Sequence, residues 1–439
     1  MTGLHFIMNL CTKHFNFNAK CSLTRWKSLF ACFIVFAIII SSCLRASARK
    51  NEWSTIWSSA LCPGGNKGDK TLNAIPATST LREIIHPSQG GRDIRIRLSN
   101  YYGEQPIVFS SVHIALKKFG SEIVPNSDRI VSFLHNNVLT LKPGKEEVSD
   151  PISLHFESFQ DIEVSLYFAQ ETPITTVHYL ALQDSYIASG DNTKSESLDK
   201  PVLIHSWPFL KSVDVKAPSI STVVAFGSSI TDGLASGENL NRRWPDYLAK
   251  RINEARLPIA VVEAGISGNR LLYNGSGKKG FKFGESGLER FQKDVVSLSG
   301  VSHVILLLGS NDIVQPGNGF TPIEQEVTSQ DVITGITTLV KTAHDHGIRV
   351  ICGTFTPFAG MKINVYNAKH EKVREEVNQW VRTTKIIDGF ADFDEAVRDP
   401  NSSLQLRSDF DSGDHLHPNS DGYRAMAEII DLNYFTDKN

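Results

Sequence analysis

Cysteine is scarce in this chain of 439 residues. Only six cysteines are present, and four of them lie within the first 48 residues: Cys11, Cys21, Cys32 and Cys43. The other two, Cys62 and Cys352, are so far apart in sequence that they cannot be assigned as a disulfide. The absence of any C-x-x-C pair excludes a zinc ribbon and a thioredoxin-type redox motif.

A surplus of basic charge is also missing. The chain has 45 Lys and Arg residues against 47 Asp and Glu residues, a formal charge of −2. Binding to nucleic acid needs clustered Lys and Arg, so we expect no nucleic acid partner. Hydrophobic residues make up 41% and charged residues 21%, as in soluble globular proteins, which excludes general disorder, collagen and a polytopic membrane protein.

The first 48 residues differ from the rest of the chain. They contain no Asp or Glu and five basic residues, so the remainder has 40 basic and 47 acidic residues, a charge of −7. An apolar run at 29–40 follows Arg25 and Lys27. A run of about 12 residues is typical of a signal peptide, because a membrane span needs about 20. We therefore expect residues 1–48 to be a signal peptide or a lipoprotein signal or anchor.

Two processing sites are visible at the end of this segment. The triplet 46–48 (ASA) is an A-x-A cleavage site, whereas residues 40–43 (ISSC) resemble a lipobox in which Cys43 would be lipidated. Either processing site predicts an exported protein that is periplasmic, secreted or membrane-anchored by its N-terminus. Membrane contact is expected only through the signal or a lipidated Cys43.

Residues 52–210 show alternating hydrophobicity. Apolar side chains recur with period two in four segments, and turn-forming residues separate these segments, which are 94–98, 112–116, 152–156 and 162–168. No helical periodicity of useful length occurs between them. The pattern predicts half-buried strands in an all-β sandwich or jelly-roll domain.

From residue 217 onward the pattern changes. Short apolar runs alternate with stretches of 3.6-residue periodicity, the runs being 221–226, 259–262, 304–308 and 349–352. The stretch 331–346 is one predicted helix, with Gly347 placed to end it. This alternation is typical of βαβ units, so residues 217–435 are predicted to form an α/β domain with a parallel sheet covered on both faces.

Polar blocks follow the predicted strands. They are 227–233 (GSSITDG), 263–270 (EAGISGNR) and 309–312 (GSND), and a fourth block, 411–419 (DSGDHLHPN), precedes the last predicted helix near 423–430. A single block of this kind is usually only a turn. Ligands of parallel sheets bind at the carboxyl ends of the strands, so four blocks at these positions indicate one shared site.

In this order the blocks resemble those of the SGNH hydrolase superfamily, the GDSL esterases and lipases. Ser229 matches the nucleophile, Gly268 the glycine of the second block, Asn311 the asparagine of the third, and Asp414 with His417 the D-x-x-H pair. The resemblance covers about residues 219–435. It implies a flavodoxin-like three-layer hydrolase domain, in a bacterial branch with a preceding β-rich domain that includes carbohydrate O-acetylesterases.

One position departs from the resemblance. Ser228 stands where the family usually has Asp, next to the nucleophile but outside the catalytic triad. The G-x-S-x-G nucleophile elbow is absent around Ser229, which argues against the α/β-hydrolase fold.

The matched residues suffice for ester hydrolysis. We expect Ser229 to be the nucleophile, His417 the general base, and Asp414 the group that orients the imidazole. The backbone N–H groups of Ser229 and Gly268 and the side-chain amide of Asn311 are the expected oxyanion donors. The predicted function is a serine carboxylic-ester hydrolase that works through an acyl-enzyme intermediate and needs no cofactor.

Metal binding is the competing interpretation of the histidines. His415 and His417 with Asp411 and Asp414 would make one cluster, but a metal there leaves the Ser and Asn blocks unexplained. The sequence 344–346 (HDH) would make another, yet it ends a predicted helix, where histidines interact favourably with the dipole. We therefore expect no metal.

The segment 274–287 is rich in glycine and lysine. It lacks the G-K-[ST] ending of a P-loop, so nucleotide binding is not expected. Because the segment follows Gly268, it can border the substrate site and offer lysines, including Lys282, to an acidic substrate. The predicted substrate-binding residues are Asn269, Arg270, Lys278 and Lys279.

Three hypotheses about function follow. The first is deacetylation of carbohydrate or cleavage of other short-chain esters, with acetylated polysaccharide as a partner. The second is a lipase or aryl esterase acting on longer or lipid esters. The third is a carbohydrate-binding surface module with a decayed hydrolase, for which Ser228 is the only sequence evidence.

Overall fold

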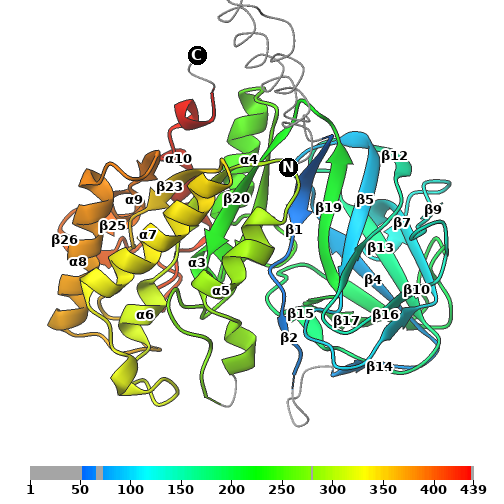
Figure 1. Ribbon diagram of the computed structural model, residues 1–439, viewed down its shortest axis with the longest axis horizontal. Helices are drawn as coiled ribbons and strands as arrows, with labels where there is room; N and C mark the ends of the chain where they lie inside the picture. The colour runs from blue at the N-terminus through cyan, green and yellow to red at the C-terminus, as the bar shows by residue number, and fades with distance from the viewer. Residues whose placement is uncertain (1–51, 66–72, 278–279, 437–439) are drawn as a thin grey trace, which may run out of the picture. The chain divides into compact units, whose positions relative to one another are not determined.

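The computed structural model describes residues 52–65, 73–277 and 280–436 (Figure 1). These residues belong to one compact unit that contains two hydrophobic cores. The predicted signal at 1–48, with Cys43, lies outside the described residues, as do Lys278 and Lys279. Within the described ranges, no helix has the length and apolar character needed to cross a membrane.

Two antiparallel sheets build the β-rich region. The first has the order β1 (Trp53–Ser58), β19 (Leu210–Lys216), β5 (Gly91–Ser99) and β11 (Glu146–Val148), with β12 (Ile152–Phe156) also paired to β5. The second runs β17 (Val202–Ile204), β16 (Ser185–Ser189), β4 (Ser79–Ile85), β13 (Ile162–Phe168), β7 (Ser111–Phe119) and β8 (Glu122–Ile123), with β9 (Arg129–Ile130) on β7. Alternate residues such as Ile94, Ile96 and Leu98 are fully buried, which confirms the predicted antiparallel β fold.

Short strands close the ends of this region. The pairs are β3 (Ala74–Ile75) with β14 (Thr172–Pro173) and β6 (Ile107–Phe109) with β10 (Leu139–Leu141). A three-stranded ribbon places β15 (Thr176–His178) between β18 (Trp207–Pro208) and β2 (Cys62–Pro63). Both of its neighbours fix the register of β15, so the direction of His178 is set by the β-rich region.

The second half contains a five-stranded parallel sheet. Its order is β21 (Ile259–Gly265), β20 (Ser221–Gly227), β22 (Val301–Leu307), β23 (Arg349–Gly353) and β24 (Gly389–Ala391). This is the flavodoxin-like order of a doubly wound sheet. Val223 to Phe226 in β20 are fully buried, because helices cover both faces. The structure therefore confirms the predicted hydrolase fold.

Helices form a layer on each face of this sheet (Figure 1). The first layer contains α4 (Trp244–Glu254), α9 (Phe393–Val397) and α10 (Ser420–Glu428), and the second contains α5 (Gly287–Phe291), α7 (Ser329–Asp345) and α8 (Ala368–Thr383). Thr328 and Asp331 form a capping box at the start of α7. Gly347, with a φ of 71°, follows its C-cap as the sequence predicts.

Shorter elements complete the chain. They are α3 (Ser229–Asp232), α6 (Ser310–Val314), the 3-10 turns η1 (Gly280–Phe283), η3 (Ile323–Gln325) and η4 (Leu432–Phe435), the π turn η2 (Gln292–Val296), and the hairpin of β25 (Arg398–Asp399) with β26 (Ser402–Leu406). Three of these, α3, α6 and η1, follow the carboxyl ends of the parallel strands and carry the candidate site.

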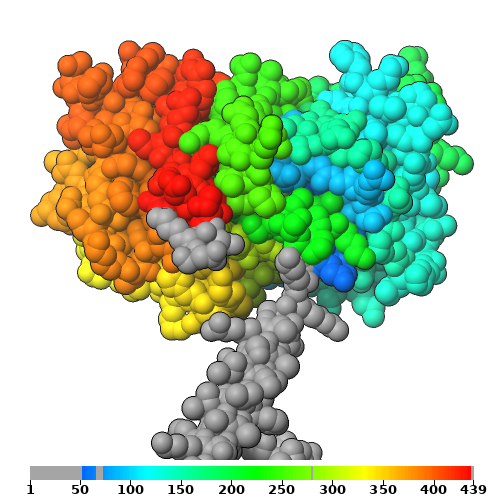
Figure 2. Space-filling view, turned by 90° about the horizontal axis from the view of Figure 1, so that it is seen from above, coloured from blue at the N-terminus to red at the C-terminus, as the bar shows by residue number. Residues whose placement is uncertain are grey.

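The β-rich region covers the outer edge of the parallel sheet at β21. The hydroxyl of Ser88 accepts a hydrogen bond from the N–H of Val261 at 3.1 Å, and the Gln89 amide donates to the carbonyl of Ile259 at 2.9 Å. Ala260 belongs to the β-rich core. Figure 2, which views the end of the molecule opposite the candidate site, shows blue and cyan segments directly against green ones. The outer edge of β21 is therefore covered by the β-rich region rather than exposed.

Candidate active site

Ser229 is the first residue of α3, two residues after β20 ends at Gly227. Its side-chain oxygen lies 2.8 Å from Nε2 of His417, and the two residues come from positions 188 apart in the chain. Ser229 is 8% exposed and His417 2% exposed, so this contact is shielded from bulk water. The structure thus brings together the predicted nucleophile and the predicted base.

Asp414 holds the other side of the His417 ring. Its Oδ2 lies 2.6 Å from Nδ1 of His417, and its Oδ1 accepts the backbone N–H groups of Leu416 and His417, each at 2.9 Å. Burial alone would raise the pKa of Asp414, but the hydrogen bonds from His417 hold it well below its ordinary value. The ionised carboxylate therefore fixes the ring with Nδ1–H toward Asp414 and Nε2 toward Ser229.

Helix α10 ties the histidine loop to the nucleophile turn. Asn419 caps the helix by accepting the N–H groups of Asp421 and Gly422. The Tyr423 hydroxyl donates to the carbonyl of Leu234 at 2.7 Å, just beyond α3. The two segments that supply Ser229 and His417 are thus linked directly.

Gly268 and Asn311 lie on neighbouring loops. The Asn311 amide donates one hydrogen bond to the carbonyl of Asn269 at 2.9 Å, and an amide has a second N–H to offer. Within the described chain, the backbone N–H groups of Ser229 and Gly268 donate no hydrogen bond. Gly268 has a φ of +77°, and a Cβ there would lie 2.4 Å from the Phe283 ring. The oxyanion role of these three residues stays a prediction.

Asp312, next to Asn311, secures the same loop from the inside. Its carboxylate accepts the backbone N–H of Leu271 at 2.6 Å and that of Leu272 at 2.9 Å. Burial raises the pKa of Asp312 to about 6 despite these hydrogen bonds. Gln315, one turn further along the chain, donates to the carbonyl of Gly268 at 2.8 Å. The loop that carries Gly268 is therefore held at both ends.

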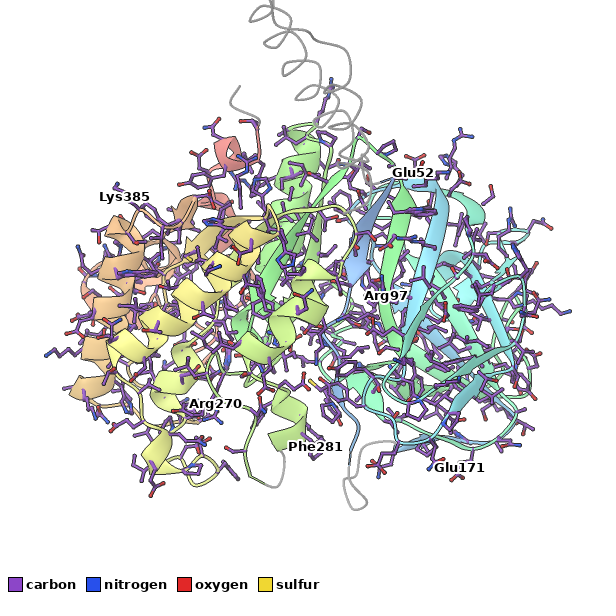
Figure 3. All side chains as sticks on the ribbon, in the orientation of Figure 1. Glu52, Arg97, Glu171, Arg270, Phe281 and Lys385 are labelled. Atoms are coloured by element: carbon purple, nitrogen blue, oxygen red, sulfur yellow. The ribbon has the colours of Figure 1, made fainter. Side chains whose placement is uncertain are left out.

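The predicted substrate-binding residues are placed differently. Asn269 is fully buried, and its amide donates to the carbonyls of Phe283 and Glu285 at 2.6 and 2.7 Å. Arg270 is 1% exposed and donates to the Gln325 side chain at 2.7 Å (Figure 3). These contacts give both residues a loop-holding role, and their contact with substrate stays a prediction.

Lys282 is the described lysine of the segment 274–287. Its Nζ lies 4.9 Å from the ring centroid of Tyr179, which belongs to the β-rich region. The Tyr179 ring also meets Phe281 at 6.0 Å, and Figure 3 labels Phe281 at the edge of the hydrolase half. The predicted lysine-bearing loop therefore contacts the β-rich region.

The sequence does not predict the contacts of two charged side chains at the site, Asp232 and Arg290. Asp232 lies inside the first polar block, where no motif assigns it a role, and its carboxylate contacts Nε2 of His178 at 3.1 Å. Arg290 donates to the carbonyls of Gly227 and Ala264, where β20 and β21 end, at 2.8 and 2.9 Å. No local pattern around residue 178 or 290 indicates these contacts, which join distant parts of the chain.

The histidines considered as metal ligands have protein partners. His415 contacts the Asp411 carboxylate, and His344 contacts Asp388 at 2.8 Å. In the part of the chain that the structure describes, one group of three has ligand atoms within 4.8 Å of one another: His178, Asp232 and Glu263. This group does not include His417 or Asp414, but its member Asp232 lies in α3 with Ser229.

Comparison with known families decides the assignment of this half of the chain. The model of the GDSL-like lipase/acylhydrolase family matches residues 225–425, a range that contains all four polar blocks. Residues 225–425 form a GDSL-like lipase/acylhydrolase domain. The match agrees with the resemblance of the four polar blocks to the GDSL esterases and lipases.

About half of the chain is similar to solved structures of low sequence identity. A GDSL-like lipase from Bacteroides thetaiotaomicron shares 19% identity, with a TM-score of 0.34, covering 49% of this chain and 88% of that one. An acetylxylan esterase from Geobacillus stearothermophilus also shares 19% identity, with a TM-score of 0.35, covering 50% of this chain and 95% of that one. No curated protein matched the chain.

Proposed function

We propose that the protein is a serine carboxylic-ester hydrolase that works through an acyl-enzyme intermediate. The hydrogen-bonded series from Ser229 through His417 to Asp414 carries the proposal. As the Ser229 oxygen attacks the ester carbonyl, Nε2 of His417 takes its proton, and the ionised Asp414 stabilises the resulting imidazolium.

The remaining steps use the same groups. The negative charge on the former carbonyl oxygen is met by the N–H groups of Ser229 and Gly268 and the free N–H of Asn311. When the carbon–oxygen bond to the alcohol breaks, His417 returns its proton to the leaving oxygen. A water then attacks the acyl-Ser229 ester with His417 again as base, which releases the acid and restores the serine. This route needs no cofactor.

The substrate that we propose is a short acyl ester, in the first place an acetyl group on carbohydrate. The Tyr179 and Phe281 rings support this, because they pack on each other two residues from Phe283, whose ring a Cβ at Gly268 would meet. A sugar ring can pack against such surfaces while its ester reaches the serine.

Exposed apolar side chains favour a second candidate, a lipase or aryl esterase. Phe320, Ile323 and Ile363 are 66%, 54% and 58% exposed on loops that follow β22 and β23. These loops are joined by a hydrogen bond of 3.0 Å from Asn318 to Asn364. Such a rim fits an acyl chain longer than acetyl.

Hydrolysis of p-nitrophenyl acetate by wild type and Ser229→Ala tests the reaction. We expect the substitution to abolish turnover, whereas Ser228→Ala, a serine in the same turn outside the triad, keeps most of it. Equal rates for wild type and Ser229→Ala would support the decayed hydrolase instead.

A chain-length series separates the two substrate candidates. Faster turnover of acetyl than of octanoyl esters supports the carbohydrate deacetylase, and the reverse order supports the lipase. If octanoyl esters are preferred, Phe320→Ser should raise their KM, while Ile429→Ser, an exposed residue at the end of α10, should not.

We also propose that the protein is exported by its N-terminal segment. The length of the apolar run at 29–40 and the basic residues Arg25 and Lys27 before it support this proposal. The mass of the mature protein would distinguish cleavage after Ala48 from a lipidated Cys43, and recovery of an unprocessed chain in the cytoplasm would contradict export.

A further inference from the structure

The carboxylate of Asp232 joins the two segments expected to supply oxyanion N–H groups. Asp232 lies three residues after Ser229 in α3 and is 1% exposed. Its Oδ2 accepts the backbone N–H of Ser267, the residue before Gly268, at 2.8 Å. Its Oδ1 lies 3.1 Å from Nε2 of His178 in the β-rich region.

His178 has oxygen acceptors at both ring nitrogens. Nδ1 lies 2.9 Å from the carbonyl of Ala60, and Nε2 lies 3.2 Å from the carbonyl of Leu180 as well as near Asp232. Carbonyls and an ionised carboxylate only accept, so both nitrogens must donate and the ring is an imidazolium. The residue is 2% exposed, and its ring stacks on Trp207 with centroids 5.5 Å apart.

The surroundings explain why a cation is needed there. Burial alone would lower the pKa of His178, but the charge and hydrogen bond of Asp232 raise it to about 9. Two other titratable or charged groups lie nearby. Burial and Asp232 raise the pKa of Glu263 in β21 to about 8, and Arg243 donates to the backbone carbonyl of Asp232 at 2.9 Å. Without the imidazolium, the buried Asp232 carboxylate would lose its ion-pair partner.

We propose that His178 is a positioning residue for the catalytic site: by pairing with Asp232, it fixes the Ser267–Gly268 backbone relative to the Ser229 turn. The proposal rests on the proposed ester hydrolysis. It makes the β-rich region part of the catalytic apparatus, because one of its side chains holds the place where the oxyanion donors meet.

A different interpretation of the same three side chains is a metal site at His178, Asp232 and Glu263. The hydrogen bonds count against it, because a metal ligand must offer a lone pair, and both nitrogens of His178 face acceptors. The test must therefore separate a positioning ion pair from a bound metal.

The test compares His178→Gln with wild type on p-nitrophenyl acetate. Glutamine keeps an N–H donor but removes the charge. Active sites are first titrated with a fluorophosphonate, so that kcat is expressed per reactive serine. We expect kcat to fall about 10- to 100-fold with KM within about 3-fold, because a displaced oxyanion donor loses part of the 10²- to 10³-fold that its removal costs.

His113→Gln is the matched control. His113, in β7, is also a buried histidine of the β-rich region, and its Nδ1 lies 2.9 Å from the carboxylate of Asp128, just before β9. The kcat of the His113→Gln variant should equal that of wild type. If His178→Gln does not fold, Asp232→Asn, which keeps the size of the side chain, takes its place with the same expected loss.

The outcomes are distinct. If wild type is active and His178→Gln has the same kcat per titrated serine, the positioning role is overturned. The proposed hydrolase activity then stands. Loss of wild-type activity on treatment with EDTA, restored by Zn²⁺, overturns it in favour of a metal site. A wild type no more active than Ser229→Ala is a failure of the proposed function itself.

Discussion

Arg290 donates a hydrogen bond to the carbonyl oxygen of Gly227 at 2.8 Å, at the end of the strand that leads to Ser229. The same guanidinium pairs with Asp294 at 3.1 Å, and Asp294 also accepts from Lys211 of the β-rich region. All three side chains are almost completely buried. Removing one member of such a buried network lowers the free energy of unfolding strongly, because the remaining charges stay buried without a partner.

Arg290→Met should therefore destabilise the protein strongly. Removing the cation takes one hydrogen bond from the carbonyls of Gly227 and Ala264 and one ion-pair partner from the buried Asp294. We therefore expect the free energy of unfolding to fall by about 3 to 5 kcal/mol. Urea unfolding measures this change. Arg424→Met, at an exposed arginine of α10, should change it by less than about 0.5 kcal/mol. Similar losses for the two variants would contradict the role of the network.

Asn311→Ala should reduce kcat with little effect on KM. The side chain is the expected third oxyanion donor, and the loss of one such donor costs about 2.7 to 4 kcal/mol of transition-state stabilisation, or about 10²- to 10³-fold. Steady-state kinetics on p-nitrophenyl acetate measure the effect. Asn364→Ala, which removes the contact between the two outer loops, is the control and should keep the wild-type kcat.

Gly268→Ala should lower activity more than its backbone strain alone explains. An alanine Cβ would meet the Phe283 ring as well as adopt a φ of +77°. Gly347 has a φ of +71° with nothing within 4 Å of its Cβ position, so Gly347→Ala isolates the strain. We expect both variants to lose about 1 kcal/mol or more of stability, and only Gly268→Ala to lose kcat. Equal kcat values would contradict a role for the Gly268 backbone.

Glu263 predicts a pH-dependent stability. Burial and the charge of Asp232 raise its pKa from an ordinary 4.5 to about 8. A raised pKa in the folded state means that the folded protein binds the proton more tightly, so this contribution to stability is complete below about pH 4.5 and is lost as the pH rises through 8.

In the Glu263→Gln variant the side chain cannot ionise, so the variant does not lose stability as the pH rises through 8. Its free energy of unfolding should exceed that of wild type at pH 9 by an amount on the order of 2 kcal/mol, and the difference should shrink toward pH 5. Urea unfolding over this pH range measures it. Glu238→Gln, at an exposed glutamate, is the control. A difference that does not depend on pH would contradict the shifted pKa.

The local patterns of the sequence predicted most of the architecture. Alternation at 94–98 and 162–168 predicted strands that the structure contains, and the apolar runs from 221 to 352 predicted four strands of the parallel sheet. These predictions succeed because burial on one or two faces leaves a periodic mark on the sequence. The strand β24 (Gly389–Ala391) is too short to leave such a mark.

The contacts around the site were predictable only in part. The three-residue separation of Asp414 and His417 anticipates their hydrogen bond, which is local. The contact of His178 with Asp232 depends on the docking of two sheets, and neither residue lies in a periodic pattern that indicates a partner. The sequence does not predict the bonds of the Asn269 amide to the carbonyls of Phe283 and Glu285, because they depend on how a distant part of the loop folds back.

The pairing of β1 with β19 also bears on how the chain folds during synthesis. Trp53 pairs with Lys216, so the first sheet of the β-rich region can close only after residue 216 has left the ribosome, shortly before β20 emerges. Ser88 and Gln89 are then already in place to receive β21 as it emerges. The β-rich region would thus serve as an internal folding template, and a truncated chain beginning at residue 217 would expose the edge of β21 and aggregate.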